Sequence, residues 1–134
     1  MSISAWDPAA EKKAEHIELQ PAVLDRLIAY SAGDKLEKLD ELLDPSESQE
    51  LSGLMKLDHD AWHDATEHLP DDNLLHLIRF FAVAENLPGW EALEKSPVIP
   101  LAKILRKRGT RLDKAFLQWL RKVNSNRYLP YGPL

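Results

Sequence analysis

Residues 73–87, NLLHLIRFFAVAENL, form the most apolar stretch of the chain, and the rest of the fold must be built around them. Apolar side chains fill most positions, whereas His76, Arg79 and Asn86 recur at spacings of three and seven and form one narrow polar stripe. A helix that is apolar on most sides is a buried helix. The stretch therefore predicts a central core helix, and at roughly 22 Å it is too short to cross a bilayer. A lone histidine on a core helix is usually a hydrogen-bonded structural residue, and we interpret His76 in this way.

Length and composition limit the classes of protein that this chain can form. A chain of 134 residues fits one domain and can bury about two thirds of its unfolded surface, so it needs no metal or disulfide to fold. The absence of cysteine excludes thiol catalysis, zinc–thiolate sites and disulfides. The first residues lack the apolar segment of a secretory signal, and no window reaches membrane-spanning length. We therefore expect a soluble cytoplasmic protein that does not act on a membrane.

The net charge of −5 hides a strong asymmetry between the two ends of the chain. Residues 1–95 contain 8 Lys or Arg and 21 Asp or Glu, a balance of −13, whereas residues 96–134 contain 9 and 1, a balance of +8. Two arrangements explain such a division. Either the basic end packs against the acidic remainder within the molecule, or it faces a polyanion or an acidic partner.

The spacing of leucines predicts three short helices before the central stretch. Pro21 opens the first helix and Gly33 ends it. Asp34 is placed to cap the second, whose core positions are Leu36, Leu39, Leu42 and Leu43. Ser46 or Ser48 is placed to cap the third, whose core positions are Leu51, Leu54, Met55 and Leu57. The short breaks between these helices favour antiparallel packing.

The chain after the central stretch predicts two further helices. Trp90 and Leu93 are expected to close over the core. One helix is expected to begin near Pro100 and to end at Gly109, which suits the positive φ of the residue after a helix. Thr110 is placed to begin the last helix, with Asp113 three positions on as a variant of the capping box. The apolar stripe of that helix consists of Leu112, Ala115, Phe116, Trp119, Leu120 and Val123.

These patterns predict an all-α protein with a single domain of about six or seven short helices. The helices are expected to form either a compact bundle or a short stack of antiparallel helical hairpins. Residues 1–19 are expected to be a loosely ordered arm, with one short helix at Pro8–His16 and Trp6 as its anchor. Residues 20–123 form the predicted helical domain. Residues 124–134 form an extended tail, which either lies over the domain or serves as a peptide for another protein.

A cluster of histidines and carboxylates lies between the third helix and the central one. His59 and His63 are four residues apart, as are Asp60 and Asp64, so one helical face can present two or three ligands to a divalent ion. The same spacing also gives ordinary pairing between histidine and carboxylate on an exposed face, which we favour. We expect no metal and no cofactor, and we keep these four residues as weak candidates for a metal site.

The basic end contains the candidate binding residues. Its last two predicted helices present cations on the faces opposite their apolar stripes, and the C-terminal tail adds one more cation. The candidate residues for an acidic partner or a polyanion are Arg106, Lys107, Arg108, Arg111, Lys114, Arg121, Lys122 and Arg127.

Three classes of function remain, and the first is favoured. It is a non-enzymatic adaptor or regulator that binds another protein, one with an acidic surface, through its oppositely charged faces. Its support is the presence of these two faces and the absence of any assembled catalytic motif in the sequence. The second is a nucleic-acid-binding protein that uses the basic helix pair, although the spacing does not match a helix-turn-helix and the acidic remainder would oppose binding. The third, the least favoured, is a metal-dependent enzyme that uses the cluster from His59 to His68.

Overall fold

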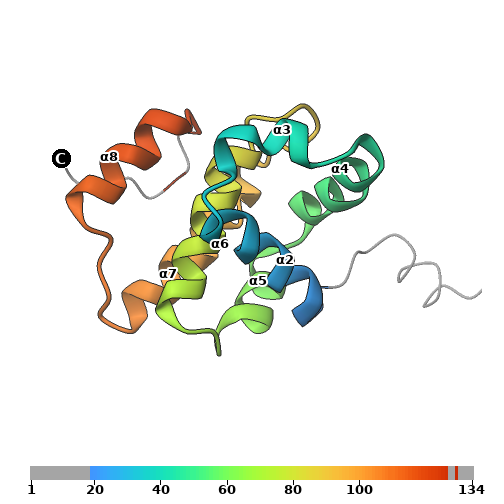
Figure 1. Ribbon diagram of the computed structural model, residues 1–134. Helices are drawn as coiled ribbons and strands as arrows, with labels where there is room; N and C mark the ends of the chain where they lie inside the picture. The colour runs from blue at the N-terminus through green and yellow to red at the C-terminus, as the bar shows by residue number, and fades with distance from the viewer. Residues whose placement is uncertain (1–18, 127–128, 130–134) are drawn as a thin grey trace, which may run out of the picture.

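The central helix α6 runs from Asp71 to Ala84 and passes through the middle of the domain (Figure 1). The computed structural model describes residues 19–126 and residue 129. Within them the fold is all-α, as the sequence predicts, with seven α-helices and three short 3₁₀ turns. The other α-helices are α2 (Pro21–Ala32), α3 (Leu39–Leu42), α4 (Pro45–Ser52), α5 (His59–Thr66), α7 (Val98–Lys107) and α8 (Lys114–Val123). The 3₁₀ turns are Leu36–Lys38, Gly53–Lys56 and Leu93–Lys95.

Helix α6 is buried because α2 and α7 pack against it and α5 packs against α7. Seven of its side chains are buried: Leu74, Leu77, Ile78, Phe80, Phe81, Ala82 and Ala84. Phe80 and Phe81 also form the centre of an aromatic cluster, with edge-on contacts to Trp90 and Trp62 at 6.0 and 5.0 Å between ring centroids. The prediction of a central core helix is confirmed. Within the described part of the chain, no helix has both the length and the apolar composition needed to span a membrane.

His76 has the structural role that the sequence suggested. Its Nδ1 atom lies 2.9 Å from the hydroxyl oxygen of Ser31, which is itself buried on α2. A buried hydroxyl without a partner would lose the free energy of its hydrogen bond to water. The pair therefore satisfies a polar group at the packed contact between α2 and α6.

The segment after α2 departs from the predicted helix at residues 34–43. Asp34 has φ of +56°, a left-handed conformation, and so cannot act as a helix cap there. The chain instead forms one 3₁₀ turn and then the single turn of α3. Leu36, Leu39 and Leu43 are buried as expected, but Leu42 is 40% exposed because the short α3 turns it away from the core.

The next helix, α4, uses a different cap from the one predicted. The Asp44 carboxylate accepts a hydrogen bond from the Glu47 amide at 2.7 Å, so Asp44 rather than Ser46 or Ser48 is the N-cap. The hydroxyl of Ser48 instead accepts from the indole Nε1 of Trp90 at 3.0 Å. Trp90 is fully buried, as predicted.

Leu93 was wrongly predicted to cover the core. Its side chain is 56% exposed, and its φ of +49° is unusual for a residue with a branched side chain. Ala92, the preceding residue, is buried and joins the core in its place. The carbonyl of Leu93 faces the segment after α8 and accepts a hydrogen bond from the side-chain amide of Asn126.

Helix α7 begins at Val98, two residues before the predicted start. Pro100 is compatible with this because the first-turn amides of a helix have no partner within it. The predicted end is confirmed. Gly109 has φ of +83°, its amide donates to the Arg106 carbonyl at 3.0 Å, and the Thr110 amide donates to the Leu105 carbonyl at 2.9 Å, which is a Schellman motif.

The last helix begins later than predicted. Thr110 does not cap it, because Asp113 accepts from the Phe116 amide at 2.7 Å and is the N-cap of α8. Leu112 therefore lies in the loop before the helix, half-buried. Beyond α8, Asn124, Asn126 and Leu129 are buried. The arm with Trp6 and the helix expected at Pro8–His16 lie outside the described residues, as do residues 127–128 and 130–134.

Candidate functional site

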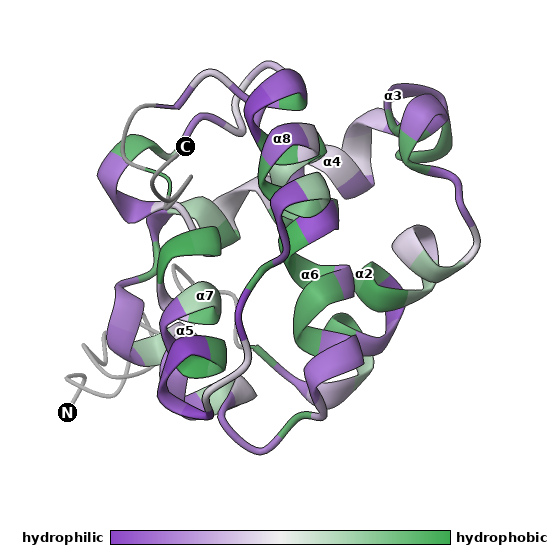
Figure 2. Cartoon of the chain, turned by 90° about the vertical axis from the view of Figure 1, so that its left-hand side faces the viewer, coloured by the Kyte–Doolittle hydropathy of each residue, from purple (hydrophilic) through white to green (hydrophobic). Residues whose placement is uncertain are grey.

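The basic residues predicted as a binding site follow one another along one side of the domain. The end of α7, the loop after it and α8 form the left-hand side of Figure 1 and face the viewer in Figure 2. We call the exposed cations of these elements the basic surface. It consists of Arg106, Lys107, Arg111, Lys114, Arg121 and Lys122. Arg127, the last of the predicted residues, lies outside the described part of the chain.

Arg108 is bonded within the molecule. Its Nη1 atom lies 2.8 Å from the Asp71 carboxylate, and its Nη2 atom donates to the Glu67 carbonyl at 2.5 Å. The hydroxyl of Thr110 donates to the other oxygen of Asp71 at 2.7 Å. The bond from Thr110, followed by that from Arg108, lowers the pKa of Asp71. Arg108 and Thr110 therefore connect the end of α7 to the start of α6.

Within the described part of the chain, most cations of the basic surface have no carboxylate as an ion-pair partner. Arg106, Lys107, Arg111, Lys114 and Lys122 are exposed, and no acid among the described residues forms an ion pair with them. Asp113 is the one acidic residue from position 96 onward, and its carboxylate is used to cap α8. For these five cations, ion pairing within the described part of the molecule does not explain the charge asymmetry of the chain.

The apolar face of α8 is only partly covered. Leu120 is its single buried residue, whereas Phe116, Trp119 and Val123 are half-buried against the core. The guanidinium carbon of Arg79 lies 5.1 Å from the ring centroid of Trp119, a cation–π contact between α6 and α8. A groove of about 550 Å³ runs beside this contact, and its lining includes Asp34, Leu36, Arg79, Val83, Trp119 and Lys122.

The four weak metal candidates do not come together. His59 Nε2 lies 2.8 Å from the carbonyl of Glu94, while His63 lies 3.4 Å from Asp64 and 3.5 Å from Glu67. The contacts of His63 are local to α5, whereas His59 contacts a carbonyl 35 residues away, so the two histidines have different partners. Among residues 19–126 and 129, no three His, Asp or Glu side chains converge where they could hold a metal ion.

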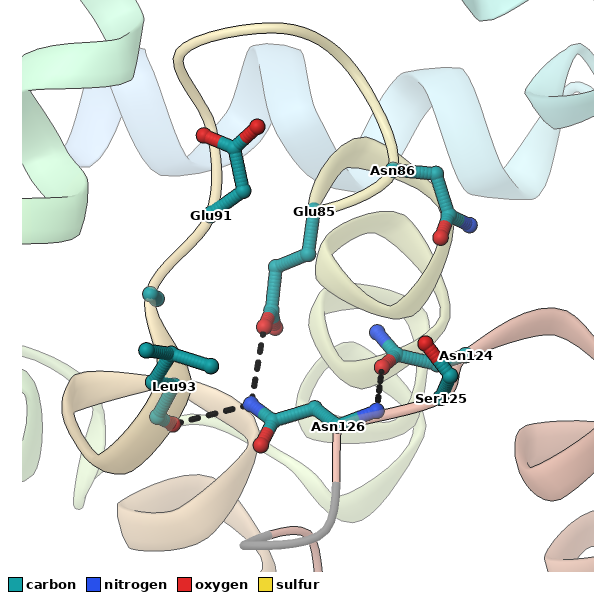
Figure 3. A pocket seen from close by; sticks show the side chains of 8 residues that line it. Glu85, Asn86, Glu91, Leu93, Asn124, Ser125 and Asn126 are labelled. Atoms are coloured by element: carbon teal, nitrogen blue, oxygen red, sulfur yellow. Dashed lines mark hydrogen bonds between the residues drawn. The ribbon is translucent and has the colours of Figure 1, made fainter.

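A cavity near the C-terminal end of α6 was not predicted from the sequence. It is open to solvent on one side and has a volume of about 360 Å³, and Figure 3 shows that its walls come from the end of α6, the loop after it and the segment after α8. It is lined by Glu85, Asn86, Glu91, Ala92, Leu93, Asn124, Ser125 and Asn126.

Glu85 is the buried carboxylate of this cavity, with only 7% of its surface exposed. One oxygen accepts from the hydroxyl of Ser96 at 2.6 Å, and the other accepts from the Asn126 side-chain amide at 3.3 Å. Burial raises the pKa of Glu85 to about 7, although both hydrogen bonds act in the opposite direction. Glu85 therefore changes charge near neutral pH.

The asparagines that line the cavity hold the chain after α8 against α6. The side-chain amide of Asn124 donates to the Ala82 carbonyl at 2.9 Å, and its side-chain oxygen accepts from the Asn126 backbone amide at 2.7 Å. The Asn126 side chain also donates to the Leu93 carbonyl at 2.8 Å (Figure 3). In the sequence Glu85 resembles an ordinary helix-end residue and Asn124-Ser125-Asn126 an ordinary polar tail, so no local pattern joins them.

Comparisons of the chain with protein-family models, with curated proteins and with solved structures find no match.

Proposed function

We propose that this protein is a helical adaptor or regulator that binds an acidic surface of another protein through the basic surface, without catalytic activity of its own. The observation that carries the proposal is that five exposed cations on α7, the following loop and α8 form no ion pair with a described acid. They are Arg106, Lys107, Arg111, Lys114 and Lys122. Exposed charges of one sign raise the rate of encounter with a surface of the opposite sign and orient it.

The same surface favours a protein partner over nucleic acid. Proteins that bind single strands without sequence preference stack bases on exposed aromatic rings. On α8, however, Trp119 already contacts the guanidinium of Arg79 and is half-buried. Residues 1–95, with a charge balance of −13, would also repel a long polyanion that extended beyond the basic surface. An acidic patch on a folded protein is more limited in extent and avoids this repulsion.

Charge reversal tests the proposal. The variant Arg106→Glu/Lys107→Glu/Lys114→Glu is compared with Lys35→Glu/Lys38→Glu/Lys56→Glu, which makes the same change of charge at exposed residues outside the basic surface. Candidate partners are captured with the intact protein, purified, and titrated against each variant. We expect the first variant to lose at least tenfold in affinity, with a strong dependence on salt, and the second to bind like the parent protein. Equal loss in both variants would contradict the proposal.

Nucleic acid is tested in parallel with labelled single-stranded and duplex oligonucleotides. Fluorescence anisotropy is measured from about 50 to 200 mM salt, the range over which phosphate contacts weaken steeply. We expect no binding near physiological salt. Micromolar binding that is independent of sequence, and that is lost only in the variant of the basic surface, would replace the adaptor proposal with the nucleic-acid one.

A further inference from the structure

The described residues that line the cavity beside Glu85 carry negative charge only. Among the described residues that line it, Glu85 and Glu91 are the only ionisable ones, and none of them is Lys, Arg or His. The carboxylate of Glu85 points into the space between the loop after α6 and Asn126 (Figure 3). The volume of about 360 Å³ falls at the lower end of the range typical of small-molecule sites, about 300 to 1,000 Å³.

The hydrogen-bond donors of the asparagines around the cavity are already directed at protein acceptors. The Asn86 side-chain amide donates to the Val123 carbonyl at 2.6 Å, and the Asn124 amide donates to the Ala82 carbonyl at 2.9 Å. The side-chain amide of Asn126 donates to both the Glu85 carboxylate and the Leu93 carbonyl. The side-chain groups that remain for a ligand include the carboxylates of Glu85 and Glu91, which accept when ionised, and the hydroxyl of Ser125, which can donate or accept.

Glu85 retains capacity as an acceptor. A carboxylate can accept about four hydrogen bonds, and Glu85 accepts one at each oxygen from Ser96 and Asn126. Glu91, which is exposed, adds a second carboxylate, and Leu93 provides an apolar wall. A buried acceptor anion, a second carboxylate and a short apolar wall together complement a small molecule with a cationic donor group and a short apolar part.

We propose that this cavity binds a small organic cation that carries N–H donors, such as an alkylammonium or alkylguanidinium, with Glu85 as its anchor. Binding then stabilises the ionised form of Glu85, which burial otherwise disfavours. Among the described residues that line the cavity, Glu91 is the one other ionisable side chain. This inference does not depend on the adaptor function.

The probe is n-butylammonium, with n-butanol as its neutral isostere and sodium chloride as the control for ionic strength. Its ammonium group has a pKa near that of lysine, about 10.4, and so stays charged at pH 6 and pH 8. Binding to the full chain is followed by ¹H–¹⁵N NMR, in which the side-chain amides of Asn124 and Asn126 report on the cavity. We expect saturable shifts with n-butylammonium at pH 8 and none with n-butanol. Because Glu85 is mostly protonated below about pH 7, affinity should fall about tenfold at pH 6.

Two variants locate the anchor. Glu85→Gln should lose at least tenfold in affinity and the dependence on pH, whereas Glu50→Gln, an exposed acid on α4, should behave like the parent. If Glu85→Gln does not fold, the proposal is tested by Glu91→Gln and by the pH dependence of binding to the parent protein. Glu91→Gln should lose affinity for n-butylammonium by a smaller factor. Absence of a saturable shift at pH 8, equal shifts with n-butanol, or the same affinity at pH 6 and pH 8 would each overturn the proposal.

Discussion

Helices α6 and α8 have the two clearest apolar patterns in the sequence, yet they are held in the fold in different ways. Seven of the 14 residues of α6 are buried, whereas α8 buries only Leu120 of its 10 residues. In Figure 2, α6 is largely green and lies among other helices, while α8 carries alternating colours and lies at the surface. An apolar stripe thus predicts which face of a helix turns inward, but not how much protein covers that face.

Polar contacts replace the missing apolar cover of α8. Asn86 donates to the Val123 carbonyl at the end of α8, and Asn124 donates back to the Ala82 carbonyl of α6. Arg79 adds the cation–π contact with Trp119. All three contacts involve the C-terminal half of α6 or the residues just beyond it. We therefore expect α8 to open locally at a lower free energy than global unfolding, which requires α6 to leave the core.

The largest effect should come from Phe81→Ala on α6. Phe81 is fully buried and contacts the rings of Trp62 and Phe80, so its truncation should lower the free energy of unfolding by about 3 to 5 kcal/mol. Urea denaturation measures the change. Leu42→Ala, at an exposed apolar position, is the control and should change stability by less than about 1 kcal/mol. An unchanged midpoint for Phe81→Ala would show that α6 is not the core helix.

The equivalent change on α8, Leu120→Ala, should have a smaller effect of about 2 to 3 kcal/mol. Leu120 is fully buried, but its neighbours on α8 are not, so the helix can separate without opening the rest of the core. Hydrogen exchange should show loss of protection in α8 while the α6 amides remain protected. Equal loss of protection in both helices would mean that they unfold as one unit and that α8 does not open independently of α6.

The network that joins the two helices should make stability depend on pH. Glu85 has a folded pKa of about 7, above the value of about 4.5 expected in the unfolded chain, so folding favours its protonated form. Its contribution to stability is fully present below about pH 4.5 and is lost as pH rises through about 7. Between pH 5 and pH 8 the loss should be on the order of 2 kcal/mol.

Glu85→Gln is the variant that tests this dependence, since glutamine can still accept from Ser96 and does not ionise. The difference in unfolding free energy between variant and parent should change sign or grow in favour of the variant as pH rises. Glu94→Gln, an exposed acid beyond the cavity, is the control. A difference that is constant from pH 5 to pH 8 would show that Glu85 does not titrate in this range.

Much of the fold could be predicted from local sequence. The burial of α6, the start of α2 at Pro21, the Schellman motif at Gly109 and the burial of Trp90 follow from periodicity and from the conformations of proline and glycine. The errors at Asp34, Ser48 and Thr110 share one cause. Each residue type is common at helix caps, but a different conformation or contact forms instead. Asp34 adopts a left-handed conformation, the hydroxyl of Ser48 accepts from Trp90, and the hydroxyl of Thr110 donates to Asp71.

In the candidate sites too, features set by local sequence could be predicted, whereas contacts between distant residues could not. The exposure of the cations on α7 and α8 could be predicted because it follows from one helical face. The engagement of Arg108 by Asp71, 37 residues away, could not. The cavity of Glu85 was also missed, because it brings together residues 41 positions apart in the chain. Local patterns place a residue on a face, but they do not identify its partner from another element.

The smallest expected effect concerns the caps of the two helices. Asp113 caps α8 with its side chain, whereas α6 has no side-chain cap and depends on burial. Asp113→Ala should therefore cost about 1 kcal/mol, and it should act mainly on the local opening of α8. Asp113→Asn, which can still accept the Phe116 amide, should restore most of the loss, and Asp72→Ala at the start of α6 is the matched control.

Amide exchange distinguishes a local effect from a global one. A loss of about 1 kcal/mol corresponds to roughly fivefold faster exchange, and we expect it in the α8 amides of Asp113→Ala but not in those of α6. Burial of α6 by α2 and α7 does not involve Asp113, which is why its amides should not respond. If the α6 amides exchange faster by the same factor, then α8 is an integral part of the core despite its single buried residue. In that case the polar contacts of Asn86 and Asn124 couple the two helices as strongly as apolar packing would.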